Sequence, residues 1–168
     1  MTQIFLECEF ISTLSIDDYY VFIAGSRTGI NREAFVFPIS IKTETGADIG
    51  TLRFEYSTST NYVFTESLMK RSVIKTNKNS INVNNNDYLL NTASFTGKYS
   101  FYIFDANLGG TPSNRGTVMR LWRSQIYDND TIVRDYIPVI DASSRPCLFD
   151  KVEKKCYYNQ GTGEFLYG

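Results

Sequence analysis

Short segments in which apolar and polar residues alternate recur along the chain, and they constrain its fold more than any other feature. In residues 4–11 the even-numbered Ile4, Leu6, Cys8 and Phe10 are apolar, and a Glu stands at positions 7 and 9. Successive side chains of a strand point to opposite faces, so this pattern predicts a strand with Cys8 directed inward. Strands are predicted in the same way, from alternation or short apolar runs, over residues 4–11, 19–24, 35–41, 49–56, 73–75, 99–104, 118–127 and 132–140.

Clusters of turn-forming residues separate these segments. They lie at residues 25–29, 45–48, 57–61, 84–87 and 109–112. Strands at intervals of about 8 to 12 residues favour an all-β fold, a two-sheet antiparallel β-sandwich or jelly roll. Short helical turns near residues 66–70 or 91–95 are compatible with this fold. Residues 78–84 predict a small hairpin that carries little core, and Asp128-Asn129-Asp130 predicts a tight hairpin turn followed by Pro138, which we expect to end regular pairing. A length of 168 residues fits a single domain over 1–168.

The composition excludes several classes of function. The chain has no histidine, which removes His-dependent hydrolase triads and His-ligated zinc. Its formal net charge is -1, so we expect no nucleic-acid partner. No apolar run of membrane-spanning length and no basic-then-apolar leader occurs, so we expect no membrane span and synthesis in the cytosol. Three cysteines, an odd number, predict free thiols, with a Cys147–Cys156 bridge as the alternative.

The last third of the chain carries a specific resemblance. Its segments are Ile126-Tyr127-Asp128-Asn129, Val133-Arg134-Asp135-Tyr136-Ile137-Pro138, Leu148-Phe149-Asp150-Lys151-Val152 and residues 157–165. In order and spacing they resemble the C-terminal part of concanavalin A-like (laminin G-like) jelly-roll modules of bacteriophage structural and adhesion proteins. The resemblance implies a non-enzymatic virion structural protein, as capsid decoration, fibre or tail adhesin, with weak binding of host-surface glycans and without a cofactor. The alternative is a carbohydrate-active enzyme or its carbohydrate-binding accessory domain.

Two departures from that pattern bear on partners. Asp130 stands where the family usually has Gly, and Asp tolerates the left-handed backbone that the turn needs. The family also usually has a further strand ahead of the one similar to residues 4–11. We therefore expect an open sheet edge near the N-terminal strand, covered by other virion proteins or copies of this chain. The resemblance places a final strand, around residues 164–167, beside the N-terminal one.

Candidate glycan-binding residues lie in two loops. Arg27, Asn31 and Arg32 offer planar donors suited to acidic sugars or carboxylates, and Tyr62 offers a ring for sugar stacking, as does Trp122 if its strand face is open. Each has a structural alternative: Arg27 pairs with a nearby carboxylate, and the aromatic rings belong to the core.

The acidic residues of the sequence can be compared with the requirements of catalytic and metal-binding sites. Glu7 and Glu9 share a strand face, as the two carboxylates of a jelly-roll glucanase do, but charged residues that alternate with apolar ones are more typical of a solvated face. The acidic pairs Asp17-Asp18 and Asp128/Asp130 lack the further oxygen ligands that calcium needs. We expect no catalytic residue and no metal.

Overall fold

The computed structural model describes residues 2–11, 20–28, 33–40, 51–57, 60–77, 80–90, 96–161 and 164–167. The chain divides into two compact units. The first comprises Met1–Cys8, Ser72–Leu89 and Leu121–Gly168, and the second comprises Glu9–Arg71 and Leu90–Arg120. Both units are built from strands, and the described residues contain no helix, so the predicted all-β class is confirmed. The described part of the chain therefore also offers no helix that could cross a membrane. The prediction of a single domain stays a prediction.

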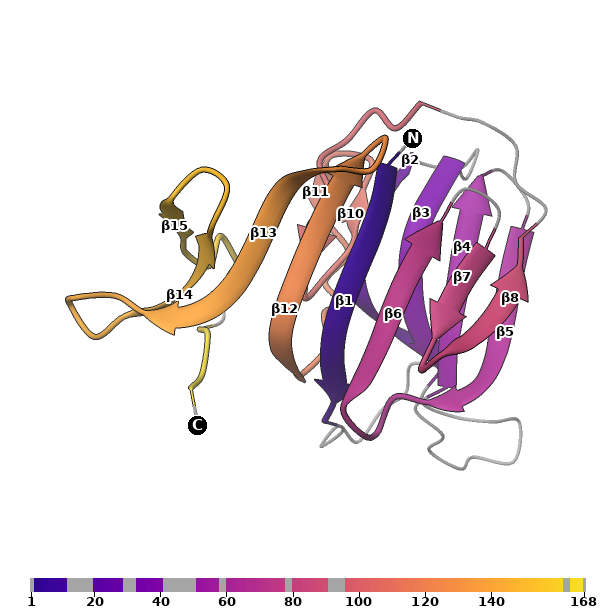
Figure 1. Ribbon diagram of the computed structural model, residues 1–168, viewed down its shortest axis with the longest axis horizontal. Helices are drawn as coiled ribbons and strands as arrows, with labels where there is room; N and C mark the ends of the chain where they lie inside the picture. Colours follow the sequence, from indigo (N-terminus) through magenta and orange to yellow (C-terminus); the bar gives the residue numbers. More distant parts are fainter. Residues whose placement is uncertain are drawn as a thin grey trace. The chain divides into compact units, whose positions relative to one another are not determined.

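The first unit holds an eight-stranded sheet in the order β15-β14-β13-β12-β1-β6-β7-β8 (Figure 1). Every pairing with a described register in it is antiparallel. Its strands are β1 (Thr2–Phe10), β6 (Ser72–Asn77), β7 (Ser80–Val83), β8 (Asn86–Leu89), β12 (Met119–Asp128), β13 (Thr131–Ile140), β14 (Pro146–Asp150) and β15 (Lys155–Tyr157).

The second unit holds a seven-stranded sheet in which β2, β3, β4 and β5 are consecutive neighbours. β10 pairs with β2 in parallel and with β11 antiparallel, and β9 pairs with β2. The strands are β2 (Tyr20–Thr28), β3 (Glu33–Ser40), β4 (Thr51–Ser57), β5 (Thr60–Ser67), β9 (Tyr102–Ile103), β10 (Asn107–Leu108) and β11 (Thr111–Pro112).

Each sheet buries one face, as the alternation of residue types predicts. In β1, Ile4, Leu6, Cys8 and Phe10 are at most 2% exposed, which confirms that Cys8 points inward. In β4, Leu52, Phe54 and Tyr56 are likewise buried. The expectation that residues 78–84 carry little core was wrong, because Ile81 and Val83 of β7 are fully buried. Asn82, which stands between them, lies on the other face of the same strand.

Turns form where Asn and Asp adopt a left-handed backbone. Asn84 and Asn85 (φ 53° and 70°) connect β7 to β8, and Asn129 and Asp130 (φ 45° and 67°) connect β12 to β13. Short polar side chains are the non-glycine residues that tolerate this region best. The predicted hairpin at Asp128-Asn129-Asp130 is confirmed, including the turn with Asp in place of Gly.

Several strand predictions need correction. β5 includes the end of the turn predicted at residues 57–61 and the start of the helical turn predicted near residues 66–70. It forms a strand there because pairing with β4 overrides the weak strand propensity of its Ser and Asn residues. Only Tyr102–Ile103 of the predicted strand 99–104 is extended in a ladder. β13 continues past Pro138 to Ile140, since Pro138 pairs with Leu148 of β14 after the pairing with β12 has ended at Tyr136.

The N-terminal strand has neighbours on both sides. β1 lies between β12 and β6, so the expected vacancy beside it is not there (Figure 1). Residues 164–167, expected as a strand next to β1, form no strand. β12 takes that place in the sheet. The edges of this sheet, within the described residues, are β8 and β15.

Candidate functional site

A row of polar and aromatic side chains crosses the eight-stranded sheet on the face opposite its buried one. Phe5 of β1 stands opposite Lys75 of β6, Lys75 opposite Asn82 of β7, and Asn82 opposite Asp87 of β8. Their strand neighbours Ile4, Leu6, Ile74 and Ile81 point to the buried face. Because side chains alternate strictly along each strand, burial of one set fixes the other set on the open face.

This open face contains a pocket of about 520 Å³, a volume typical of small-molecule sites. Its lining comes entirely from the first unit. Amides, carboxylates, an ammonium and two aromatic rings are among the groups in this lining. They are Gln3, Phe5, Lys75, Asn77, Asn82, Asn85, Asp87, Gln125, Tyr127 and Asp130.

Hydrogen bonds between strands hold the amides in place. Gln3 is 9% exposed, and its Nε2 donates to Asn77 Oδ1 (3.3 Å) and to Asp130 Oδ1 (3.1 Å). It therefore joins the turn of the β12–β13 hairpin to β1 and β6. On the other side, Asn82 Nδ2 donates to Asp87 Oδ1 (2.9 Å), and the backbone N–H of Asn85 donates to Asn82 Oδ1 (3.2 Å).

The two left-handed turns bring polar side chains to this pocket. Asn85 is the second residue of the β7–β8 turn, and Asp130 is the second residue of the β12–β13 turn. Both turns are short, so the residue at the tip stays next to the strand ends that line the pocket.

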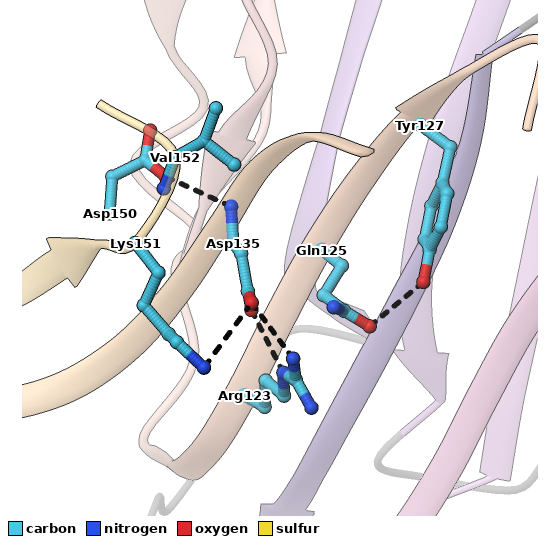
Figure 2. A network of polar contacts seen from close by, with 7 residues as sticks. All are labelled: Arg123, Gln125, Tyr127, Asp135, Asp150, Lys151 and Val152. Atoms are coloured by element: carbon cyan, nitrogen blue, oxygen red, sulfur yellow. Dashed lines mark hydrogen bonds and ion pairs between the residues drawn. The ribbon is translucent and has the colours of Figure 1, made fainter. Parts of the chain in front are cut away.

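A second polar network supports the pocket from β12 (Figure 2). Arg123 donates from Nε and a terminal nitrogen to the two carboxylate oxygens of Asp135, each at 2.8 Å. The hydrogen bond from Arg123 outweighs the opposing effect of burial and holds the pKa of Asp135 below its usual range. Gln125 is the cross-strand partner of Asp135, and its Oε1 accepts from the Tyr127 hydroxyl at 3.0 Å. Gln125 thus lies beside the salt bridge and is hydrogen-bonded to a pocket-lining ring.

Asp150 fixes the backbone beside that network. It is fully buried, and its Oδ1 accepts from the backbone N–H groups of Asp135 (3.0 Å) and Val152 (2.9 Å), as Figure 2 shows. Arg134 Nε lies 3.6 Å from its other oxygen. Asp150 therefore has a structural role beside the network.

The sequence-predicted glycan residues do not line this pocket. Arg27 lies on the seven-stranded sheet, 3.7 Å from Glu55, with both side chains about one-fifth exposed, which is the structural alternative considered for it. Tyr62 belongs to β5, where its backbone pairs with Phe54. Asn31 and Arg32 lie outside the described residues. Trp122 is half-buried, and alternation along β12 places it on the face opposite Gln125.

The structure describes some of the acidic residues that the sequence analysis considered as catalytic or metal-binding groups. Glu9 forms an ion pair with Arg120 (3.2 Å), and Glu7 lies two residues earlier on the same face of β1. Among the described residues, no group of three or more Cys, Asp or Glu is placed to hold a metal ion. The pair Asp17-Asp18 lies outside the described residues.

All three thiols are free, in agreement with the prediction. Burial raises the pKa of Cys8 to about 12 and, together with a hydrogen bond to Cys156, the pKa of Cys147 to about 11. Neither thiol is activated for nucleophilic chemistry.

The pocket escaped prediction because its members are distant in sequence and lie in segments that read as turns or solvated faces. Comparisons of the chain with protein-family models, with curated proteins and with solved structures found no match.

Proposed function

We propose that the chain is a non-enzymatic glycan-binding structural module of a bacteriophage virion. The observation that carries the binding part is the pocket on the eight-stranded sheet, with its amides, carboxylates and two rings. Side-chain amides and carboxylates form paired hydrogen bonds with adjacent sugar hydroxyls, and aromatic rings offer an apolar surface to the C–H groups of a sugar. The virion placement rests on the resemblance of residues 119–165 to phage modules.

A β-sandwich is part of this proposal. Each sheet has one buried face lined with Ile, Leu and Phe, and two such faces are most simply buried against each other. The jelly-roll connection of concanavalin A-like modules is the form of sandwich that the resemblance implies.

Assembly with other virion proteins, or with copies of this chain, completes the proposal. Within the described residues, β8 and β15 end the eight-stranded sheet, and unpaired backbone groups of an edge strand can accept another strand. Copies held together on one particle would raise the avidity of a weak site without new contacts.

A glycan array tests the binding function. The chain is displayed in several copies on a carrier, and its binding is compared with that of a Gln125→Ala variant and of a Glu164→Gln control, since Glu164 is exposed outside any strand. The proposal predicts binding that the Gln125 variant loses and the control keeps. Binding of no glycan, or equal binding by the Gln125 variant, contradicts it.

The enzyme alternative rests on Glu7 and Glu9, which share a face of β1. Incubation of glycans with wild type, Glu7→Gln and Glu9→Gln, followed by mass spectrometry of the products, decides between the two functions. Cleavage that disappears in either variant would support a glycosidase. Intact glycans support the binding module.

A further inference from the structure

We propose that the pocket selects uncharged sugars over acidic ones, an inference that rests on the proposed glycan-binding function and deepens it. Three ionised side chains line the pocket: Asp87, Asp130 and Lys75. Two carboxylates and one ammonium leave the lining with one excess negative charge. A sugar that carries a carboxylate, sulfate or phosphate would enter against this charge.

The hydrogen-bonding capacity of the pocket points to the same class of ligand. Asp87 uses one carboxylate oxygen to accept from Asn82, and Asp130 uses one to accept from Gln3. The second oxygen of each accepts no hydrogen bond from the described part of the chain. These oxygens can only accept, so the matching ligand group is a donor, and sugar hydroxyls are donors whereas a ligand carboxylate is not.

Lys75 does not reverse this balance. Its Nζ lies 5.6 Å from the centroid of the Phe5 ring, and its side chain is exposed. Asp87 and Asp130 are exposed as well, so hydration weakens all three charges, and two carboxylates still outweigh one ammonium. The acidic-sugar chemistry suggested by the sequence relied on Arg27, Asn31 and Arg32. Of these, Arg27 pairs with Glu55 in the other unit, and the other two lie outside the described residues.

The test compares matched ligands by isothermal titration calorimetry. The probes are neutral oligosaccharides from the array and the same oligosaccharides with one hexose replaced by its uronic acid. We expect the neutral member of each pair to bind more tightly, with an affinity that changes less than about twofold between low and high salt, because no net charge is screened. Tighter binding of the acidic member overturns the inference.

Charge variants give an independent readout. Asp87→Asn and Asp130→Asn should each weaken binding of the neutral sugar about fivefold to tenfold, since hydrogen bonds to a charged acceptor are stronger than those to an amide oxygen. Asn tolerates the left-handed backbone at position 130, so the turn is kept. Asp128→Asn, which makes the same change in charge outside the pocket lining, is the control.

Lys75→Gln separates the two ligand classes further. It should change the affinity for the neutral sugar less than about threefold, because an uncharged sugar offers the ammonium no opposite charge. A loss of more than tenfold in this variant, or a gain of affinity for the acidic sugar in both Asp variants without loss of the neutral one, contradicts selection of uncharged sugars. Failure of wild type to bind any glycan contradicts the proposed function instead.

Discussion

At the scale of single residues, a buried carboxylate holds the last strands of the eight-stranded sheet together. Asp150 is 0% exposed, and one of its oxygens accepts from two backbone N–H groups. These hydrogen bonds join β13 to the turn that follows β14.

Replacement of Asp150 by Ala leaves the N–H groups of Asp135 and Val152 without their acceptor. We expect the free energy of unfolding to fall by about 2–4 kcal/mol, measured by urea denaturation. Glu164→Ala, at an exposed position outside the strands, should change it by less than about 0.5 kcal/mol. Equal stability of the Asp150 variant and wild type would refute this role.

The three thiols should differ in reactivity. Cys8 and Cys147 are at most 2% exposed with a raised pKa, whereas Cys156 is half-buried. Titration of the native chain with a thiol reagent near pH 8 should modify Cys156 first, and the two others only after unfolding. Mass spectrometry that finds a Cys147–Cys156 bridge in the native chain would contradict the free thiols.

At the scale of elements, the β12–β13 hairpin links stability to the pocket. Its strands carry the Arg123–Asp135 salt bridge, and its turn carries Asp130 into the pocket. The two tasks are separable, because the salt bridge and the turn are distinct parts of one element.

Asp130→Gly separates the turn from the site. Glycine adopts a φ of 67° without strain, so we expect the melting temperature to stay within a few degrees of the wild-type value. The variant also loses the acceptor of Gln3 Nε2 and a pocket carboxylate, so glycan affinity should fall about tenfold. A variant that binds as tightly as wild type would show that the turn residue takes no part in recognition.

The salt bridge should make stability depend on pH. The guanidinium of Arg123 lowers the pKa of Asp135, so the ionised carboxylate is favoured in the folded chain. Its contribution is present above the unfolded pKa of about 3.9 and is lost as pH falls through the lower folded value. Arg123→Gln should cost about 1 kcal/mol at pH 7, an estimate reduced because Arg123 is 37% exposed.

The same measurement at acid pH provides the control. Below pH 3.9 the difference in unfolding free energy between Arg123→Gln and wild type should narrow, because protonated Asp135 no longer attracts the guanidinium. A difference that stays constant from pH 7 to pH 2.5 would assign the loss to packing rather than to charge.

At the scale of the whole molecule, two sheets each bury one face, and within the described residues β8 and β15 are the edges of the eight-stranded sheet. Leu89 ends β8 at one edge of the eight-stranded sheet and is 87% exposed. An apolar side chain on an edge strand favours association, whereas a lysine there opposes it.

Light scattering of the purified chain measures that association. We expect an oligomer that Leu89→Lys shifts toward monomer. Leu166→Lys, at a position equally exposed but outside any strand, should leave the oligomer intact. A monodisperse wild-type monomer would remove the edge as an assembly site between copies.

The sequence predicts those features that depend on local alternation and turn chemistry. β1, β12 and β13 follow from their residue patterns, and the left-handed Asn129 and Asp130 follow from the tolerance of their side chains. Strand neighbours cannot be read in this way, since pairing joins residues far apart in sequence, and β12 beside β1 is an instance.

The pocket residues could not be predicted from the sequence for the same reason. Gln3, Asn82 and Gln125 come from separate strands, and only the register of those strands places them around one hollow. Asn82 reads locally as part of a weak hairpin, because nothing near it reveals that Ile81 and Val83 anchor the strand in the core.

The central proposal is that a glycan binds in the pocket of the eight-stranded sheet. The side-chain amide resonances of Gln3, Asn82 and Gln125, which line this pocket, report on such binding directly. Titration of the isotope-labelled chain with a neutral oligosaccharide, followed by NMR, should shift these resonances together in a saturable way while those of Gln160, outside the pocket, stay unchanged. Saturable shifts confined to other residues, or no shift with any neutral oligosaccharide, would contradict the account.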